Sequence, residues 1–163
     1  MAWTSPRTWA PGEDLTAANF NTHVRDNLKA IGDAWTAYTP TLTWTSSSFT
    51  FTRSGRYMQA GKLVHFWAKA VISGGTYGSG TGVPTLSLPV TAYTLDGLYG
   101  SIGGFYLDSG ANYYRINAGG ASTTTVSMPY PGTNGVNTSP TSTVPFTWTT
   151  NDGFFIAGTY EAA

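Results

Sequence analysis

The sequence contains no cysteine among its 163 residues. This absence excludes disulfide bonds, thiol nucleophiles and thiolate metal sites together. Charged residues are also scarce, at 10% of the chain, and eight Lys and Arg balance eight Asp and Glu, so the formal net charge is +0 at pH 7. A neutral chain has no general electrostatic attraction to nucleic acid or anionic lipid, so we expect neither as a partner.

Long apolar runs are missing as well. Residues 1–15 lack the apolar core of a secretory signal. The longest apolar stretch, residues 63–71, is interrupted by His65 and Lys69 and is too short to cross a bilayer. We therefore expect a soluble protein without membrane insertion.

Aromatic residues are abundant, at 15% of the chain, which indicates a folded protein. The mass of 17.3 kDa suits one domain with a short appendage. After Trp35 the composition shifts from helix formers to Thr, Ser, Gly, Val and aromatic residues. The sequence thus predicts an N-terminal arm and amphipathic helix over residues 1–36 and a β head over residues 37–163.

The first part of this N-terminal segment is predicted to be an extended arm. Pro6 and Pro11 disfavour a helix at the residues before them. Trp3 and Trp9 would be exposed on such an arm unless they dock on another surface.

A helix is predicted over residues 17–31, with Thr16 as its N-cap and Gly32 as its C′ residue. The apolar side chains that form its stripe and its N-terminal hydrophobic staple are Leu15, Phe20, Val24, Leu28 and Ile31. A helix this short is marginal in water on its own, so the stripe needs a packing partner.

The remainder of the chain reads as short strands separated by turn residues. The predicted strands are residues 39–45, 49–53, 56–60, 62–72, 85–88, 97–107, 113–117, 124–128, 145–148 and 153–160. Ser54 and Gly55 are expected to separate two of them, and residues 73–82 and 129–140 are expected to be long loops. This pattern predicts a jelly-roll-like antiparallel β-sandwich.

No constellation in the sequence indicates catalysis, a cofactor or a metal. His23 and His65 are interpreted as structural, and Asp152 as a turn residue in Asn-Asp-Gly. A polysaccharide hydrolase using Asp108 or Asp152 ranks last among our hypotheses, because no paired carboxylates stand out. The glycine-rich residues 74–82 lack the Gly-Lys-Ser/Thr ending of a phosphate-binding loop.

Aromatic residues in or beside loops and strand edges are candidate contacts for a glycan or a protein partner, since rings stack on sugars and anchor interfaces. They are Trp44, Tyr77, Tyr113, Tyr114 and Tyr130. The favoured alternative is that most of these side chains fill the core or a subunit interface.

Several stretches together resemble a known class of proteins. The segments WTSPRTW at 3–9 and GEDLTAANFNTHVRDNL at 12–28 resemble the N-terminal attachment segment of small virion proteins of tailed bacteriophages, notably those infecting actinobacteria. YTPTLT at 38–43, GRYMQAGKLV at 55–64 and GTYEA at 158–162 are similar to the jelly-roll heads of phage minor tail, fibre and capsid-decorating proteins. Residues 73–150 carry no resemblance, and Asn19 stands where the attachment segment has Gln or Glu.

The resemblance implies a homotrimeric virion component, assembled in the host cytoplasm and exposed on the particle surface, as a capsid decoration, head fibre or minor tail protein. It implies that Trp3, Arg7 and Trp9 anchor the chain to other virion proteins and that the head contacts host glycans. The alternative from another class is a stand-alone carbohydrate-binding module or lectin, which would explain the head and leave the arm without a role.

Overall fold

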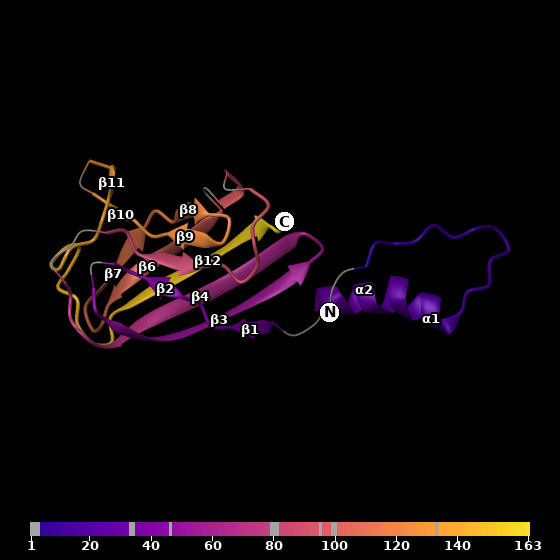
Figure 1. Ribbon diagram of the computed structural model, residues 1–163, viewed down its shortest axis with the longest axis horizontal. Coiled ribbons are helices and arrows are strands. Elements are labelled where there is room, and N and C mark those ends of the chain that lie inside the picture. Colours follow the sequence, from indigo (N-terminus) through magenta and orange to yellow (C-terminus); the bar gives the residue numbers. More distant parts are fainter. Residues whose placement is uncertain are drawn as a thin grey trace.

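A computed structural model describes residues 4–32, 35–45, 47–78, 82–94, 96–98, 101–132 and 134–163, with only the backbone of Ala30 and Gly97. The described chain is mainly β and its sheets are antiparallel. Figure 1 shows the strands gathered into a head and the N-terminal helix extending from one end of it. Trp3, one of the three expected anchor residues, lies outside the described residues.

The N-terminal helix occupies the predicted range. It consists of α1 (Ala17–Phe20), a π-helical segment η1 (Asn21–Arg25) and α2 (Asp26–Gly32). Thr16 caps it as predicted, because its hydroxyl accepts a hydrogen bond from Asn19 N at 3.2 Å. The π segment was not predicted, and Gly32 belongs to the last turn of α2.

The head contains a six-stranded and a four-stranded sheet. The larger one has the order β1 (Thr36–Tyr38), β3 (Thr50–Ala60), β4 (Leu63–Gly74), β12 (Gly153–Glu161), β6 (Ile102–Asp108) and β7 (Asn112–Ile116). The smaller one has the order β2 (Leu42–Thr43), β5 (Thr85–Ser87), β9 (Thr125–Ser127) and β8 (Gly119–Ser122). A short ladder of β10 (Tyr130–Pro131) and β11 (Asn137–Thr138) and a 3-10 turn η2 (Asp96–Leu98) complete it.

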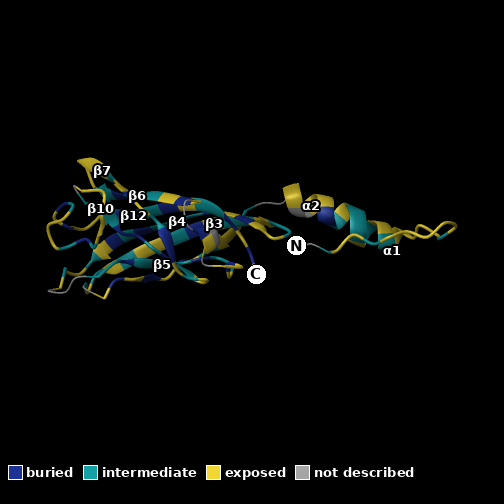
Figure 2. Cartoon of the chain, turned by 90° about the horizontal axis from the view of Figure 1, so that it is seen from above, coloured by how far each residue is buried: buried dark blue, intermediate teal, exposed yellow. Residues whose placement is uncertain are grey.

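The core lies between the two sheets, and strand alternation explains it. Every second residue of β4 from Val64 to Ile72 is buried, and Leu86 and Val126 are buried on the smaller sheet. Figure 2 shows this buried layer running through the head, whereas the helix is largely exposed. At one end of the core, Phe154 stacks on Trp148 with ring centroids 5.1 Å apart.

Buried tyrosines add polar atoms to this core. Tyr160 donates a hydrogen bond from its hydroxyl to Val90 O at 2.7 Å, and burial raises its pKa to about 12. Burial and the nearby Tyr160 also raise the pKa of Tyr38, whose hydroxyl has no hydrogen-bond partner among the described residues. Tyr106 donates to Met128 O, and burial raises its pKa as well. These phenols are therefore neutral in the folded head at ordinary pH.

Two strand boundaries differ from the predictions. Ser54 and Gly55 do not separate strands, because β3 runs through both of them. Gly55 lies within the strand because the Tyr38 ring packs against it: a Cβ there would be 2.5 Å from Tyr38 Cε1. Of the strand expected over residues 39–45, only Leu42–Thr43 (β2) forms, whereas β1 at Thr36–Tyr38 was not predicted; the two belong to different sheets, with Pro40 between them.

Other differences lie in the second half of the chain. Residues 145–148 are not a strand: the Val144–Pro145 peptide bond is cis, and Phe146 and Trp148 are buried outside any ladder. Strand β6 begins at Ile102 rather than at residue 97, and β8 was not predicted at all. The expected loop at 129–140 holds the β10 and β11 ladder, and β4 extends into the loop expected at 73–82.

Candidate functional site

The arm folds back along the helix instead of standing free. Asn27 is buried, at 5% exposure, and its side chain bonds the backbone of Thr4 in both directions, accepting from Thr4 N at 2.9 Å and donating to Thr4 O at 2.8 Å. The ring nitrogen Nδ1 of His23 lies 3.3 Å from Ser5 O. The contact between arm and helix is thus a polar latch centred on Asn27.

An ion pair, a cation–π contact and an aromatic contact fix the far end of the arm. Arg7 forms an ion pair with Glu13, whose second oxygen accepts from Ala10 N at 3.1 Å. The guanidinium of Arg7 lies 4.7 Å from the centre of the Trp9 ring, and Trp9 meets His23 edge-on with centroids 6.5 Å apart. Two of the expected anchor residues are therefore neighbours, and both remain accessible at the surface of the arm.

The arm leaves the apolar stripe of the helix uncovered. Of the stripe residues, only Val24 is half-buried, and the others are 45% to 65% exposed. The exposed members are Leu15, Phe20, Leu28 and Ile31. A short helix with this much uncovered apolar surface is stable in water only when another surface packs on it.

A groove opens at one edge of the head, where the two sheets end. Strand β1 pairs with β3 only at residues 55–57, so residues 50–54 of β3 form an uncovered edge beside β2, the edge strand of the smaller sheet. Between these edges lies a hollow of about 470 Å³, which we call the edge groove. Its lining residues are Leu42, Thr43, Trp44, Thr45, Ser47, Phe49, Thr50, Phe51 and Arg53.

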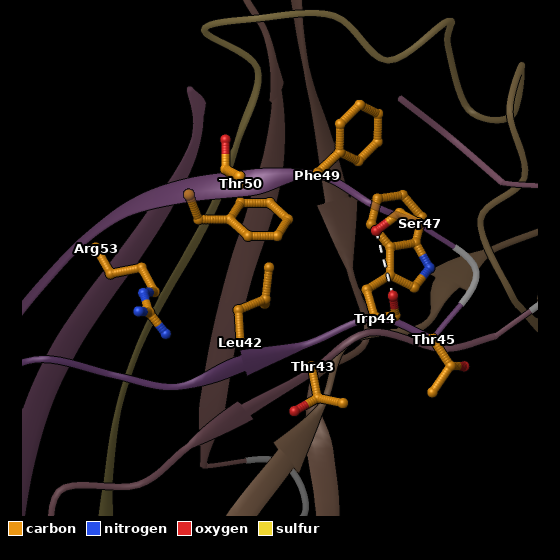
Figure 3. Close-up of a pocket in the computed structure, with 9 residues that line it drawn as sticks. Leu42, Thr43, Trp44, Thr45, Ser47, Phe49, Thr50 and Arg53 are labelled. Atoms are coloured by element: carbon orange, nitrogen blue, oxygen red, sulfur yellow. Dashed lines mark hydrogen bonds between the residues drawn. The ribbon is translucent and has the colours of Figure 1, made fainter. Parts of the chain in front are cut away.

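The edge groove combines apolar walls, hydroxyls and one cation. Figure 3 shows Arg53 reaching from β3 toward the strand that carries Leu42. Arg53 is exposed, and among the described residues no ion pair or hydrogen bond engages its side chain. None of the described residues that line the groove carries a carboxylate. This arrangement can accept an anionic group at Arg53 and apolar surface along Leu42 and Phe51.

Another hollow, of about 230 Å³, lies on the outer face of the six-stranded sheet. Its walls are Trp67 on one side and Phe105 with Phe155 on the other, and these two phenylalanine rings stack with centroids 4.9 Å apart. Its floor includes Gly103, above which a Cβ would meet nothing within 4 Å. An apolar hollow beside an aromatic ridge is typical of protein interfaces.

The five aromatic residues expected as glycan or partner contacts fall in different environments. Trp44 is 5% exposed and donates its indole N–H to Gly82 O at 2.9 Å, so its ring face belongs to the core and is not available for stacking. Tyr77 packs edge-on against Trp44, and Tyr114 stacks on Phe146. Tyr113 is 72% exposed, while Tyr77, Tyr114 and Tyr130 are half-buried. Of these five residues, Trp44 and Tyr77 have rings in contact.

The titratable residues considered in the sequence have structural contacts. Asp152 is 1% exposed, and its carboxylate accepts from Ser109 N and Thr149 N, which confirms its interpretation as a turn residue. His65 Nδ1 lies 2.8 Å from Thr159 Oγ1, and Trp35 meets the His65 ring edge-on.

Among the residues that the structure describes, no group of three or more His, Asp or Glu side chains is placed to hold a metal ion. No helix among those residues has both the length and the apolar character that a membrane span requires.

Sequence reasoning missed Arg53 and Asn27. A signal existed for each: Arg53 follows the alternation that puts Phe49 and Phe51 inward, and Asn27 is a polar residue beside the apolar stripe, between Val24 and Leu28. A polar residue at an inward position marks either an open edge or a polar contact, which only the pairing of distant segments can reveal.

Comparisons with protein families, with curated proteins and with solved structures give no match for this chain.

Proposed function

We propose that this chain is a structural component of a tailed-phage virion, attached through its arm and helix and presenting the β head on the particle surface. The observation that carries the proposal is the helix stripe: a helix that extends from the head with Leu28 and Ile31 exposed requires a partner surface. The accessible pair of Arg7 and Trp9 offers an anchor beside it. Capsid decoration, head fibre and minor tail protein all fit this arrangement.

We further propose that three copies assemble through the helix stripe and the outer face of the six-stranded sheet, with the head as a jelly roll. Support for self-association comes from the apolar hollow between Trp67 and Phe105, which lies uncovered on the same chain as the stripe. Two antiparallel sheets with the last strand, β12, between β4 and β6 support the jelly-roll assignment.

A chain lacking residues 1–14 tests the attachment role. We expect the truncated head to fold and to be absent from purified particles, because the Arg7 and Trp9 anchor is gone. Normal incorporation of the truncated chain would refute the anchor assignment.

Light scattering on the full chain tests the assembly. We expect a mass of three times the chain mass of 17.3 kDa. A Leu28→Asp variant should shift the measured mass toward that of a single chain, because it places a charge in the apolar stripe.

A stand-alone carbohydrate-binding module is the second candidate, and the edge groove is the observation that favours it. A full-length chain that stays monomeric, is absent from particles and binds glycan would establish this alternative over the virion role.

A further inference from the structure

The edge groove carries an unbalanced charge. Arg53 borders it with an unpaired guanidinium, and Arg53 also lines a neighbouring hollow of about 360 Å³ together with Arg56 and Trp67. The two hollows therefore meet at Arg53. Arg56 likewise has no described ion-pair partner, and no carboxylate lines either hollow. In a chain whose formal net charge is +0, two cations in these adjoining hollows, Arg53 in both and Arg56 in the second, are a local excess that an anionic ligand would balance.

The other residues that line the two hollows indicate what kind of molecule carries the anionic group. The side chains of Leu42, Phe49 and Phe51 give the edge groove apolar walls, and Thr43 and Thr45 are exposed along it. Ser54 and Thr39 add hydroxyls to the neighbouring hollow. A sugar ring offers this combination, because its C–H face is apolar and its hydroxyls bond to Ser and Thr.

We propose that the edge groove binds an acidic glycan, in which a carboxylate or phosphate on a sugar pairs with Arg53 and the next anionic group along the chain lies near Arg56. A guanidinium can bind either group with two parallel hydrogen bonds, which gives specificity as well as affinity. This inference rests on the proposed display of the head on the particle surface and on the expectation that the head contacts host glycans, and it names the class of glycan.

The rings of the groove favour a sugar over a nucleic acid base. Binding of single strands depends on aromatic faces that are free for stacking. Here Phe49 contacts Trp44 and Phe51, with ring centroids 6.0 Å and 6.3 Å apart, and Trp44 is buried. The exposed hydroxyls of Thr43 and Thr45 beside Arg53 instead suit the hydroxyls and the anionic group of an acidic sugar.

Titration calorimetry on the full chain tests the proposal with matched ligands and variants. The ligands are an oligogalacturonate, the same oligosaccharide as its neutral methyl ester, a phosphorylated mannose oligosaccharide, inorganic phosphate and oligothymidylate. The variants are Arg53→Gln, Arg53→Lys and, as control, Arg115→Gln, which removes an exposed arginine on β7 outside both hollows. Since Arg53 is exposed, its replacement should leave the unfolding midpoint unchanged, which a denaturation curve verifies.

We expect at least one acidic oligosaccharide to bind, its affinity to fall roughly tenfold or more in Arg53→Gln, and Arg53→Lys to lie between the two. Arg115→Gln should bind as the unaltered chain does. Binding of the uronate alone, or of the phosphorylated sugar alone, supports the proposal and identifies the source of the anion.

Four results would overturn the acidic-glycan site. They are no binding of either acidic oligosaccharide, equal affinity for the methyl ester, equal affinity for inorganic phosphate alone, and Arg53-dependent binding of oligothymidylate. The proposed virion role is judged separately, because Arg53→Gln should still enter particles. Loss of glycan binding with normal incorporation therefore separates the two proposals.

Discussion

The head and the N-terminal unit of this chain are stabilised by different forces. In the head, Phe154 is 1% exposed and packs among Trp44, Tyr106 and Trp148, so the domain is held by its own apolar core. In the N-terminal unit the arm and helix are joined by the polar latch at Asn27, while the apolar stripe faces outward. One chain thus combines a self-sufficient domain with a segment that needs a partner.

Because the head has its own core and the helix stripe is exposed, folding and assembly depend on different residues of the chain. Loss of a ring from the head core removes packing that no other molecule can replace. Loss of a ring from the helix stripe removes surface that contacts only what the helix is docked against. Substitutions in the two regions should therefore affect different measurements.

The largest expected effect follows from truncating the core. Phe154→Ala should lower the free energy of unfolding by about 3–5 kcal/mol, because it leaves a cavity beside the Trp148 ring. The matched change, Phe20→Ala, removes a ring that is 45% exposed and should change head stability by less than about 0.5 kcal/mol. Urea denaturation of both variants at one chain concentration, followed by tryptophan fluorescence, measures the difference. Equal destabilisation would show that the helix packs on the head in solution.

The same contrast determines how much the sequence could predict. The helix was predictable because Thr16 and the apolar spacing are local signals, and most strands followed from alternation over a few residues. The break expected at Ser54 and Gly55 was wrong. Gly55 was interpreted as a turn residue, but it lies inside β3, where the ring of Tyr38 leaves no room for a Cβ. Tyr38 is on another strand, so the sequence around Gly55 does not reveal this contact.

The candidate site was less predictable than the fold. The edge groove exists because β1 covers only residues 55–57 of β3 and because β2 belongs to the other sheet, and neither fact is encoded within a short window. Arg53 becomes a site residue only through that pairing. Likewise, Trp44 was a candidate surface contact because it lies near a predicted strand end, but it packs against the rings of Phe154 and Trp148 and is buried.

A smaller effect is expected from two neighbouring glycines in β6. A Cβ on Gly104 would collide with the backbone oxygen of Phe155 and lie 2.9 Å from Ile156 Cγ2, whereas a Cβ on Gly103 would meet nothing within 4 Å. Gly104→Ala should lower the free energy of unfolding by about 1–3 kcal/mol, because the backbone in the centre of the sheet cannot move to make room for the methyl group. Gly103→Ala should leave the free energy of unfolding unchanged or raise it by about 0.5 kcal/mol, because alanine lowers the conformational entropy of the unfolded chain.

Thermal unfolding of the two glycine variants provides the measurement. The prediction fails if Gly103→Ala is as destabilising as Gly104→Ala. Because Gly103 also forms the floor of the outer hollow, light scattering on Gly103→Ala adds a second comparison: a stable head with weakened self-association would indicate that copies pack on this face.

The smallest effect is expected at the latch, and it should be confined to the N-terminal unit. Asn27→Ala removes both hydrogen bonds to Thr4, so the protection of the Thr4 amide against hydrogen exchange should fall roughly tenfold while head amides stay unchanged. Arg25→Ala is the control, because the exposed Arg25 pairs with its neighbour Asp26 rather than with the arm. Unchanged protection at Thr4 would mean that Asn27 does not hold the arm. A selective loss would instead show that the arm can be released without cost to the head, as a segment that docks on another protein requires.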